Sequence, residues 1–218
     1  MSAGGIAVNS WTNYVKDFVG DHSKVFSIAD SGVFITFDPI SGRVGKSSFE
    51  NLFTLSNVDE ASPSAECNQH YPGEEWKCWA IEIIYPYIKG RYMIINSEYD
   101  AYTIPNILKI KCLKNGTSGE TLSKCNKTEL DYIEKYRAAY KQTLNKFVAI
   151  NPDLSIWSIA CSKHVYACYK DFYDSPHQKI PANTGKTVRD AVEEFVFHGT
   201  KNVLFDAEGW PSNTGCAM

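Results

Sequence analysis

The feature that most constrains the fold is a pair of short apolar runs, RYMIIN at residues 91–96 and LSIWSIA at residues 154–160. Nearly continuous apolar runs of this length are typical of strands in a parallel sheet, because helices cover both faces of such a sheet and both sets of side chains are buried. A helical pattern separates the two runs, as the crossover between parallel neighbours requires. The sequence therefore predicts an α/β fold, a parallel sheet with helices on both faces.

The rest of the chain continues this alternation of strands and helices. A strand is expected at residues 24–29, and helices are expected at 6–19, 49–55 and 79–88 and after the capping-box patterns Thr128-x-x-Asp131 and Thr187-x-x-Asp190. The first helix carries its apolar residues on one stripe: Ala7, Val8, Trp11, Tyr14, Val15, Phe18 and Val19. Neither an internal repeat nor a linker divides the 218 residues, so we expect a single domain over residues 1–218.

Six of the seven cysteines fall into three close pairs along the sequence. We expect disulfides between Cys67 and Cys78 and between Cys112 and Cys125, each closing a short loop in an insertion over the binding face. Cys161 and Cys168 form the third close pair, but Cys216 could pair with either of them.

Two N-glycosylation sequons, at Asn115 and Asn126, lie at the loop between Cys112 and Cys125. Paired cysteines and sequons together favour a secreted protein or one of the endomembrane lumen. The first residues do not resemble a signal peptide, so we expect that segment to lie upstream of Met1.

The charge pattern argues against several classes of partner. The formal net charge is −3, and the basic residues are scattered, which argues against nucleic acid or an anionic membrane surface. No apolar run has the length of a membrane span. Neither a P-loop nor a dinucleotide-binding glycine pattern is present. We expect no cofactor and no metal, and we expect a monomer.

Three residues that bear catalytic groups follow predicted strands or precede a helix at one edge of the sheet. Asp100 follows the strand at 91–96, His164 follows the strand at 154–160, and Ser2 directly precedes the first helix. Functional groups collect at the carboxyl ends of parallel strands. Ser2, Ala3 and Gly4 match the last three positions of G-x-S-x-G, and the order Ser, Asp, His is that of α/β-hydrolases. A base must activate a serine hydroxyl and a carboxylate must orient that base, so we predict a Ser2-His164-Asp100 triad with the Ala3 N–H as an oxyanion donor.

Each residue also has a simpler interpretation. Ser2 could serve only as a helix N-cap, and Asp100 could cap a turn. His164 could be structural, or it could bind zinc, since Cys161, His164 and Cys168 form C-x2-H-x3-C. The sequence leaves these alternatives open.

An ordered series of motifs resembles the pectin acetylesterase family, which also contains the animal Notum carboxylesterases. The series begins with Ser2-Ala-Gly-Gly-Ile, continues with Ile28-Ala-Asp30-Ser-Gly-Val-Phe34, Ile95-Asn96-Ser-Glu-Tyr-Asp100 and Ala160-Cys161-Ser-Lys-His164, and ends with Gly209-Trp210-Pro211 near a terminal cysteine. The resemblance spans the whole chain. It implies a secreted, disulfide-containing α/β-hydrolase that cleaves carboxylic esters without a cofactor.

The resemblance also implies roles for residues and a class of substrate. Carried over, Ser2 is the nucleophile, Asp100 the orienting acid and His164 the base, while Asp30 and Phe34 belong to the pocket wall. The implied reaction removes O-acetyl groups from a cell-wall or other polysaccharide. The alternatives are removal of palmitoleoyl from a lipidated protein, or a non-catalytic secreted fragment that serves as a binding module. The family has a large portion ahead of the serine, so we expect this chain to be the C-terminal part of a larger catalytic domain.

Overall fold

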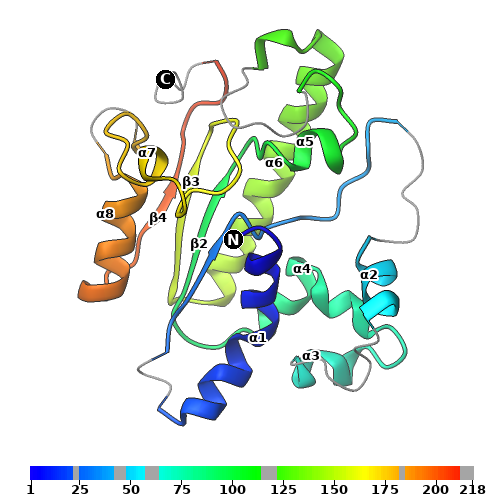
Figure 1. Ribbon diagram of the computed structural model, residues 1–218, viewed down its shortest axis with the longest axis vertical. Coiled ribbons are helices and arrows are strands. Elements are labelled where there is room, and N and C mark those ends of the chain that lie inside the picture. Colours follow the sequence, from blue (N-terminus) through cyan, green and yellow to red (C-terminus); the bar gives the residue numbers. More distant parts are fainter. Residues whose placement is uncertain (22–24, 42–47, 57–63, 114–121, 182–184, 212–218) are drawn as a thin grey trace.

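The computed structural model contains a sheet of four parallel strands in the order β1-β2-β3-β4, seen in Figure 1. The strands are β1 (Ser27–Asp30), β2 (Tyr92–Ser97), β3 (Leu154–Ile159) and β4 (Val203–Phe205). The structure describes residues 1–21, 25–41, 48–56, 64–113, 122–181 and 185–211, without the side chains of Ser48, Asp171 and Phe172. The predicted parallel α/β sheet is confirmed, and β4 adds a strand that the sequence did not predict.

The described helices are mostly short, apart from the first and the sixth. They are α1 (Ala3–Val19), α2 (Ser48–Ser56), α3 (Ala65–His70), α4 (Ile81–Ile84), α5 (Thr103–Asn106), α6 (Lys127–Ile150), α7 (Lys170–Tyr173) and α8 (Val188–Glu193), with the 3₁₀ turns η2 (Glu75–Trp79), η3 (Tyr85–Tyr87) and η4 (Leu122–Lys124) and the π-helical η5 (Glu194–His198). The single helix predicted at 79–88 is wrong: α4 ends before η3, where Pro86 cannot donate a helical hydrogen bond. None of the described helices has both the length and the apolar character of a membrane span.

Side chains of the two central strands alternate between two separate cores. Tyr92 and Ile94 of β2 pack on the face that carries α4 and α6, whereas Met93 and Ile95 pack on the face that carries α8 and η5. Figure 1 shows α8 on the side of the sheet opposite to α4 and α6. This two-sided burial is the reason why β2 reads as an uninterrupted apolar run.

The apolar stripe of helix α1 lies mostly at the surface. Its buried side chains include Asn9, Thr12 and Lys16, whereas most members of the apolar stripe are exposed. The exposed ones are Ala7, Trp11, Tyr14, Val15, Phe18 and Val19. The helix itself forms as predicted and ends at Gly20, whose φ of 75° suits a left-handed cap. The periodicity thus indicated a helix correctly, but the described part of the chain does not cover its apolar face.

Two capping boxes differ in how well the sequence located them. Thr187 and Asp190 form the predicted box at the start of α8. The box predicted at Thr128 and Asp131 is wrong, because Asn126 accepts from the Glu129 N–H at 3.0 Å and Glu129 accepts from the Asn126 N–H at 3.0 Å. An asparagine caps a helix as well as a threonine does, so the helix begins one residue after Asn126.

The two disulfides predicted in the insertions are confirmed, since Cys67 bonds to Cys78 and Cys112 bonds to Cys125. The third close pair does not form a bridge. Cys161 is disulfide-bonded, but none of the other described cysteines is its partner, and Cys168 is free and exposed. The short separation of Cys161 and Cys168 in sequence therefore did not predict a disulfide correctly. Cys216 lies outside the described residues.

Candidate active site

Ser2 lies in the sharp turn that leads into α1, with φ 54° and ψ −121°. A positive φ strains any residue that has a side chain, and such strain recurs where a turn presents a functional group. The Ser2 N–H donates to the carbonyl of Asp30 at 2.8 Å, which ties the turn to the carboxyl end of β1. Figure 1 shows the N-terminus at this end of the sheet. Ser2 occupies the N-cap position, but its hydroxyl makes no capping hydrogen bond, so the simple N-cap interpretation is not supported.

Glycines allow α1 to approach the segment after β1 at backbone contact. A Cβ on Gly5 would lie 2.7 Å from the Cα of Gly32, and a Cβ on Gly32 would lie 2.7 Å from the Cα of Gly5. Since no side chain fits between them, the two glycines hold the start of α1 against the end of β1. Ala3, the expected oxyanion donor, supplies the first amide of α1, and the first amides of a helix have no partner within it.

Asp100 and His164 meet across the sheet edge, as the sequence predicts. The Nδ1 atom of His164 lies 2.6 Å from Oδ2 of Asp100. The other carboxylate oxygen of Asp100 accepts from the amides of Tyr102 and Thr103 at 3.0 and 2.8 Å, which fixes the carboxylate at the start of α5. Asp100 therefore does cap a turn, but it does so with one oxygen and leaves the other for the imidazole. A buried carboxylate on Nδ1 directs Nε2 away from itself and stabilises the charged ring.

Asp30 connects the turn that bears Ser2 with the loop that bears His164. Its backbone carbonyl accepts from Ser2, and its buried carboxylate accepts from the amides of Tyr166 and Ala167 at 2.9 and 2.8 Å. The neighbouring Ser31 hydroxyl accepts from the Val165 amide at 2.8 Å and donates to Asp30 at 3.0 Å. Asp30 and Ser31 at the end of β1 thus anchor both segments. The Asp30 carboxylate is bonded to this loop, and the place of Asp30 in the pocket wall stays a prediction.

Aromatic rings surround the imidazole of His164. The ring of Tyr102 stacks on it at 5.4 Å, and the ring of Phe34 lies 6.3 Å away, with an edge contact of 6.0 Å between Phe34 and Tyr102. Phe34 thus lies beside His164, as its expected place in the pocket wall requires, and that role remains a prediction. Tyr102 is 45% exposed, and the sequence reasoning missed it because only the fold brings it onto the imidazole.

A buried ion pair supports the turn that carries Asp100. Glu98 is fully buried, and its carboxylate lies 2.5 Å from Nε of Arg137 and 3.7 Å from Nζ of Lys141, both on α6. Burial raises the pKa of Glu98 to about 7, against the opposing effect of the two cations. The sequence reasoning missed Glu98, although the polar residues Asn96, Glu98 and Asp100 alternate at the end of an apolar strand. That alternation could have indicated a polar cluster at the strand end.

The C-x2-H-x3-C motif, the alternative interpretation as a zinc site, lacks one of its two sulfur ligands. Cys161 is engaged in a disulfide, so it cannot provide a thiolate beside His164.

Of the predicted glycosylation sites, Asn126 is exposed at the N-cap of α6, whereas Asn115 lies outside the described residues. Glycosylation at either asparagine remains a prediction.

Known proteins are similar to this chain along its whole length. A model of the Pectinacetylesterase family matches residues 1–217. Pectin acetylesterase 5 of Arabidopsis thaliana is 20% identical over 226 residues, which cover 99% of this chain and 50% of the relative. Pectin acetylesterase 4 of the same plant is 21% identical over 227 residues, which cover 99% of this chain and 52% of the relative. The chain thus spans about half the length of the curated relatives that it matches.

Solved structures of similar fold come from Drosophila. Two crystal forms of the Wnt deacylase Notum superpose with TM-scores of 0.72 and 0.74, at 20% and 19% identity. Each match covers 99% of this chain and 57% of the Notum chain. At this level of identity the likeness supports the fold, which is that of an α/β-hydrolase-like sheet.

Proposed function

Because this chain belongs to the pectinacetylesterase family, we propose that it carries the acyl-transfer residues of a carboxylic ester hydrolase. The observation that carries the proposal is the 2.6 Å contact between His164 Nδ1 and Asp100 Oδ2 at the strand end that also holds Ser2. A carboxylate, an imidazole and a serine in a strained turn are the parts that a serine esterase requires.

In the proposed reaction, Nε2 of His164 removes the proton from the Ser2 hydroxyl while the serine oxygen attacks the ester carbonyl. Asp100 keeps the other ring nitrogen protonated and stabilises the imidazolium that forms. The Ala3 N–H stabilises the negative oxygen of the tetrahedral intermediate. His164 then returns the proton to the departing alcohol, which leaves Ser2 acylated. A water molecule, activated by the same imidazole, releases the acid and restores the serine.

The proposed substrate is an acetyl ester on a polysaccharide. The names of the curated relatives, pectin acetylesterases 4 and 5, suggest this class. The rings of Phe34 and Tyr102 beside His164 suit the apolar part of a small acyl group. Two disulfides in the insertions favour action in an oxidising compartment, so we propose a secreted or lumenal protein.

We also propose that the chain works as part of a larger catalytic domain. Its relatives are about twice as long, and β1 pairs with β2 alone among the described strands. Helix α1 packs against β1, and its apolar face, which includes Trp11, Val15 and Phe18, is exposed. Exposed apolar faces and free strand edges are normally covered, so further residues of the same domain would pack here.

A fluorophosphonate probe tests the proposal, because it bonds covalently to an activated serine. The 218-residue chain and a form extended at its N-terminus are each treated with the probe and assayed for acetyl-ester hydrolysis. We expect labelling at Ser2, which Ser2→Ala removes and the exposed-site control Ser56→Ala keeps. We also expect Asp100→Asn to lower kcat by about 10⁴-fold.

The remaining outcomes distinguish the alternatives. Faster hydrolysis of long-chain acyl esters than of acetyl esters would favour a lipid-protein deacylase. Activity of the extended form alone supports the larger domain. If the extended, folded protein is neither labelled nor active, the esterase proposal is wrong and a non-catalytic binding module takes its place.

A further inference from the structure

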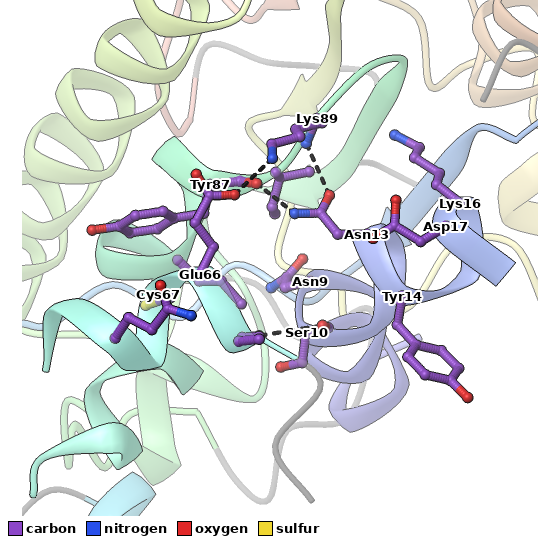
Figure 2. A pocket seen from close by; sticks show the side chains of 15 residues that line it. Asn9, Ser10, Asn13, Tyr14, Lys16, Asp17, Glu66, Cys67, Tyr87 and Lys89 are labelled. Carbon is purple, nitrogen blue, oxygen red and sulfur yellow. Dashed lines mark hydrogen bonds and ion pairs between the residues drawn. The ribbon is translucent and has the colours of Figure 1, made fainter. Parts of the chain in front are cut away.

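A deeply buried ion pair lies directly after β2, next to the proposed catalytic residues. The side chain of Glu98 is 0% exposed and that of Arg137 is 12% exposed. Ion pairs farther from the site are more exposed, as between Lys89 and Glu66, whose side chains are 63% and 51% exposed on the wall of a cavity beside α1 (Figure 2). Removing two charges from water costs about as much as their attraction returns, so stability alone does not explain a buried pair.

Two cations of helix α6 join the carboxyl ends of β2 and β4. Nε of Arg137 lies 2.5 Å, and Nζ of Lys141 lies 3.7 Å, from carboxylate oxygens of Glu98. Both cations also donate to the backbone carbonyl of Asp206, which directly follows β4, at 3.4 and 2.6 Å. We name Glu98, Arg137, Lys141 and Asp206 the α6 charge cluster.

The α6 charge cluster also holds the end of β3, which lies between β2 and β4. The carboxylate of Asp206 accepts from the N–H of Ala160, the first residue after β3, at 2.6 Å. From the other side, the N–H of Glu98 donates to the carbonyl of Ile159 at 2.8 Å. The first residues after three neighbouring strands are therefore tied to one another and to one helix.

The chain after β4 packs over this cluster. The guanidinium of Arg137 lies 5.6 Å from the centroid of the Tyr99 ring. A Cβ on Gly209 would lie 2.8 Å from Nη1 of Arg137 and 2.7 Å from the hydroxyl of Tyr99, so only a glycine fits here. The next amide, that of Trp210, donates to the same hydroxyl at 2.9 Å. This packing restricts Arg137 to its place beside Glu98.

We propose that the α6 charge cluster positions the carboxylate of Asp100 against the imidazole of His164, with Arg137 as its central residue. Asp100 follows the end of β2 and His164 follows the end of β3, so their contact depends on how these two ends lie relative to each other. A charge-assisted contact of 2.6 Å tolerates little displacement of either end. The inference rests on the proposed function, since it takes these residues as the acid and the base.

A double substitution separates positioning from stability. Glu98→Met together with Arg137→Met replaces the pair by apolar side chains of similar length, and such replacements of buried ion pairs are often neutral or stabilising. We therefore expect the melting temperature of the 218-residue double variant to be no lower than that of the original chain. The control is Lys127→Gln with Asp131→Asn, which removes an exposed ion pair of the same helix.

Native-state hydrogen exchange reports the position of Asp100 without requiring esterase activity. The amides of Tyr102 and Thr103 donate to one oxygen of Asp100, so their protection depends on where that carboxylate lies. We expect both amides to exchange about tenfold or more faster in the double methionine variant. The amide of Ile156 within β3 should keep its exchange rate, and the control variant should keep all three rates.

The same variant is assayed for acetyl-ester hydrolysis in whichever form of the protein is active. Because Glu98 is fully buried and cannot touch a substrate, we expect kcat to fall about tenfold or more while KM is unchanged. Faster exchange of the Tyr102 and Thr103 amides in a protein that hydrolyses no ester supports the positioning role and counts against the esterase function alone.

Two results overturn the proposal. One is unchanged exchange of the Tyr102 and Thr103 amides in a folded double methionine variant. The other is a lower melting temperature, or loss of the fold, with the Ile156 amide exchanging as much faster as the other two. In that case the ion pair stabilises the whole domain and has no particular effect on Asp100.

Discussion

Replacement of Asp30 should loosen the loop that carries the proposed base. Asp30→Asn removes the charge but keeps one oxygen, and Asp30→Ala removes both acceptors. In the structure the carboxylate accepts from the amides of Tyr166 and Ala167 and from the hydroxyl of Ser31. All three bonds involve a charged acceptor, so each is worth more than a neutral hydrogen bond.

The magnitude follows from these contacts. A hydrogen bond to a charged group contributes about 1.5–3 kcal/mol, against about 0.5–1.5 kcal/mol for a neutral one. Asp30→Asn keeps the two amide bonds in neutral form, so we expect a loss of about 2 kcal/mol in the free energy of unfolding. Asp30→Ala leaves the amides of Tyr166 and Ala167 without a partner, so we expect a loss of about 4 kcal/mol. For a chain of this size the first loss corresponds to roughly 4–8 °C in Tm.

Urea unfolding measures both losses, followed by the fluorescence of the five tryptophans. Asp38→Asn is the matched control, because that residue is exposed, and we expect its effect to stay within about 0.5 kcal/mol. The anchoring role also predicts that the proton shared by His164 and Asp100 exchanges faster with solvent in Asp30→Asn. Losses below about 0.5 kcal/mol in both Asp30 variants would refute the argument that this carboxylate anchors the loop.

Three further predictions follow from the site and its surroundings. Gly5→Ala forces a Cβ to within 2.7 Å of the Gly32 backbone, so we expect the free energy of unfolding in urea to fall by about 3 kcal/mol or more. Gly4→Ala is the control and should be nearly neutral, because no atom lies within 4 Å of the added Cβ. Equal effects of the two substitutions would contradict the close-packing argument. The pKa of Glu98 is raised from 4.5 to about 7 in the native state. Between these two values the native state holds a proton that the unfolded state has lost. The free energy of unfolding should therefore fall by at most about 3 kcal/mol as the pH rises from about 5 to about 7. Glu98→Gln should remove that dependence, and an unchanged pH profile in the variant would assign it to another group. Cys168, free and exposed, should react with a thiol reagent in the native protein, and Cys168→Ser should abolish that labelling; a native Cys168 that resists the reagent would contradict its exposure.

Much of the site was predictable because it depends on local patterns and on a general rule of topology. The apolar runs of β2 and β3 indicated parallel strands, and parallel strands bring their carboxyl ends to one edge. Asp100 and His164 each follow one of these strands, so their contact followed from the sheet. The two short disulfides were predictable for a similar reason, since each joins cysteines close in sequence within one insertion.

Other features depend on which segments meet in space, and a local sequence pattern does not predict such contacts. The stripe of α1 predicted a helix, but the fold buries Lys16 and exposes Phe18, because the described chain places no layer against the apolar side. Cys161 and Cys168 are close in sequence, yet they are not bonded to each other. The same holds for Asp30, whose partners lie more than a hundred residues away along the chain.

The sequence by itself determined the types of the long helices and of the central strands, the parallel sheet and the edge at which the catalytic candidates gather, because periodicity is a local property and the pairing of parallel strands follows from it. Only the tertiary structure decided the φ of Ser2, the role of Asp30 as a shared anchor and the burial of Lys16. Strain, burial and shared hydrogen bonds depend on the distance between segments that are remote in sequence. That distance exists only once the sheet and its two helical layers have packed.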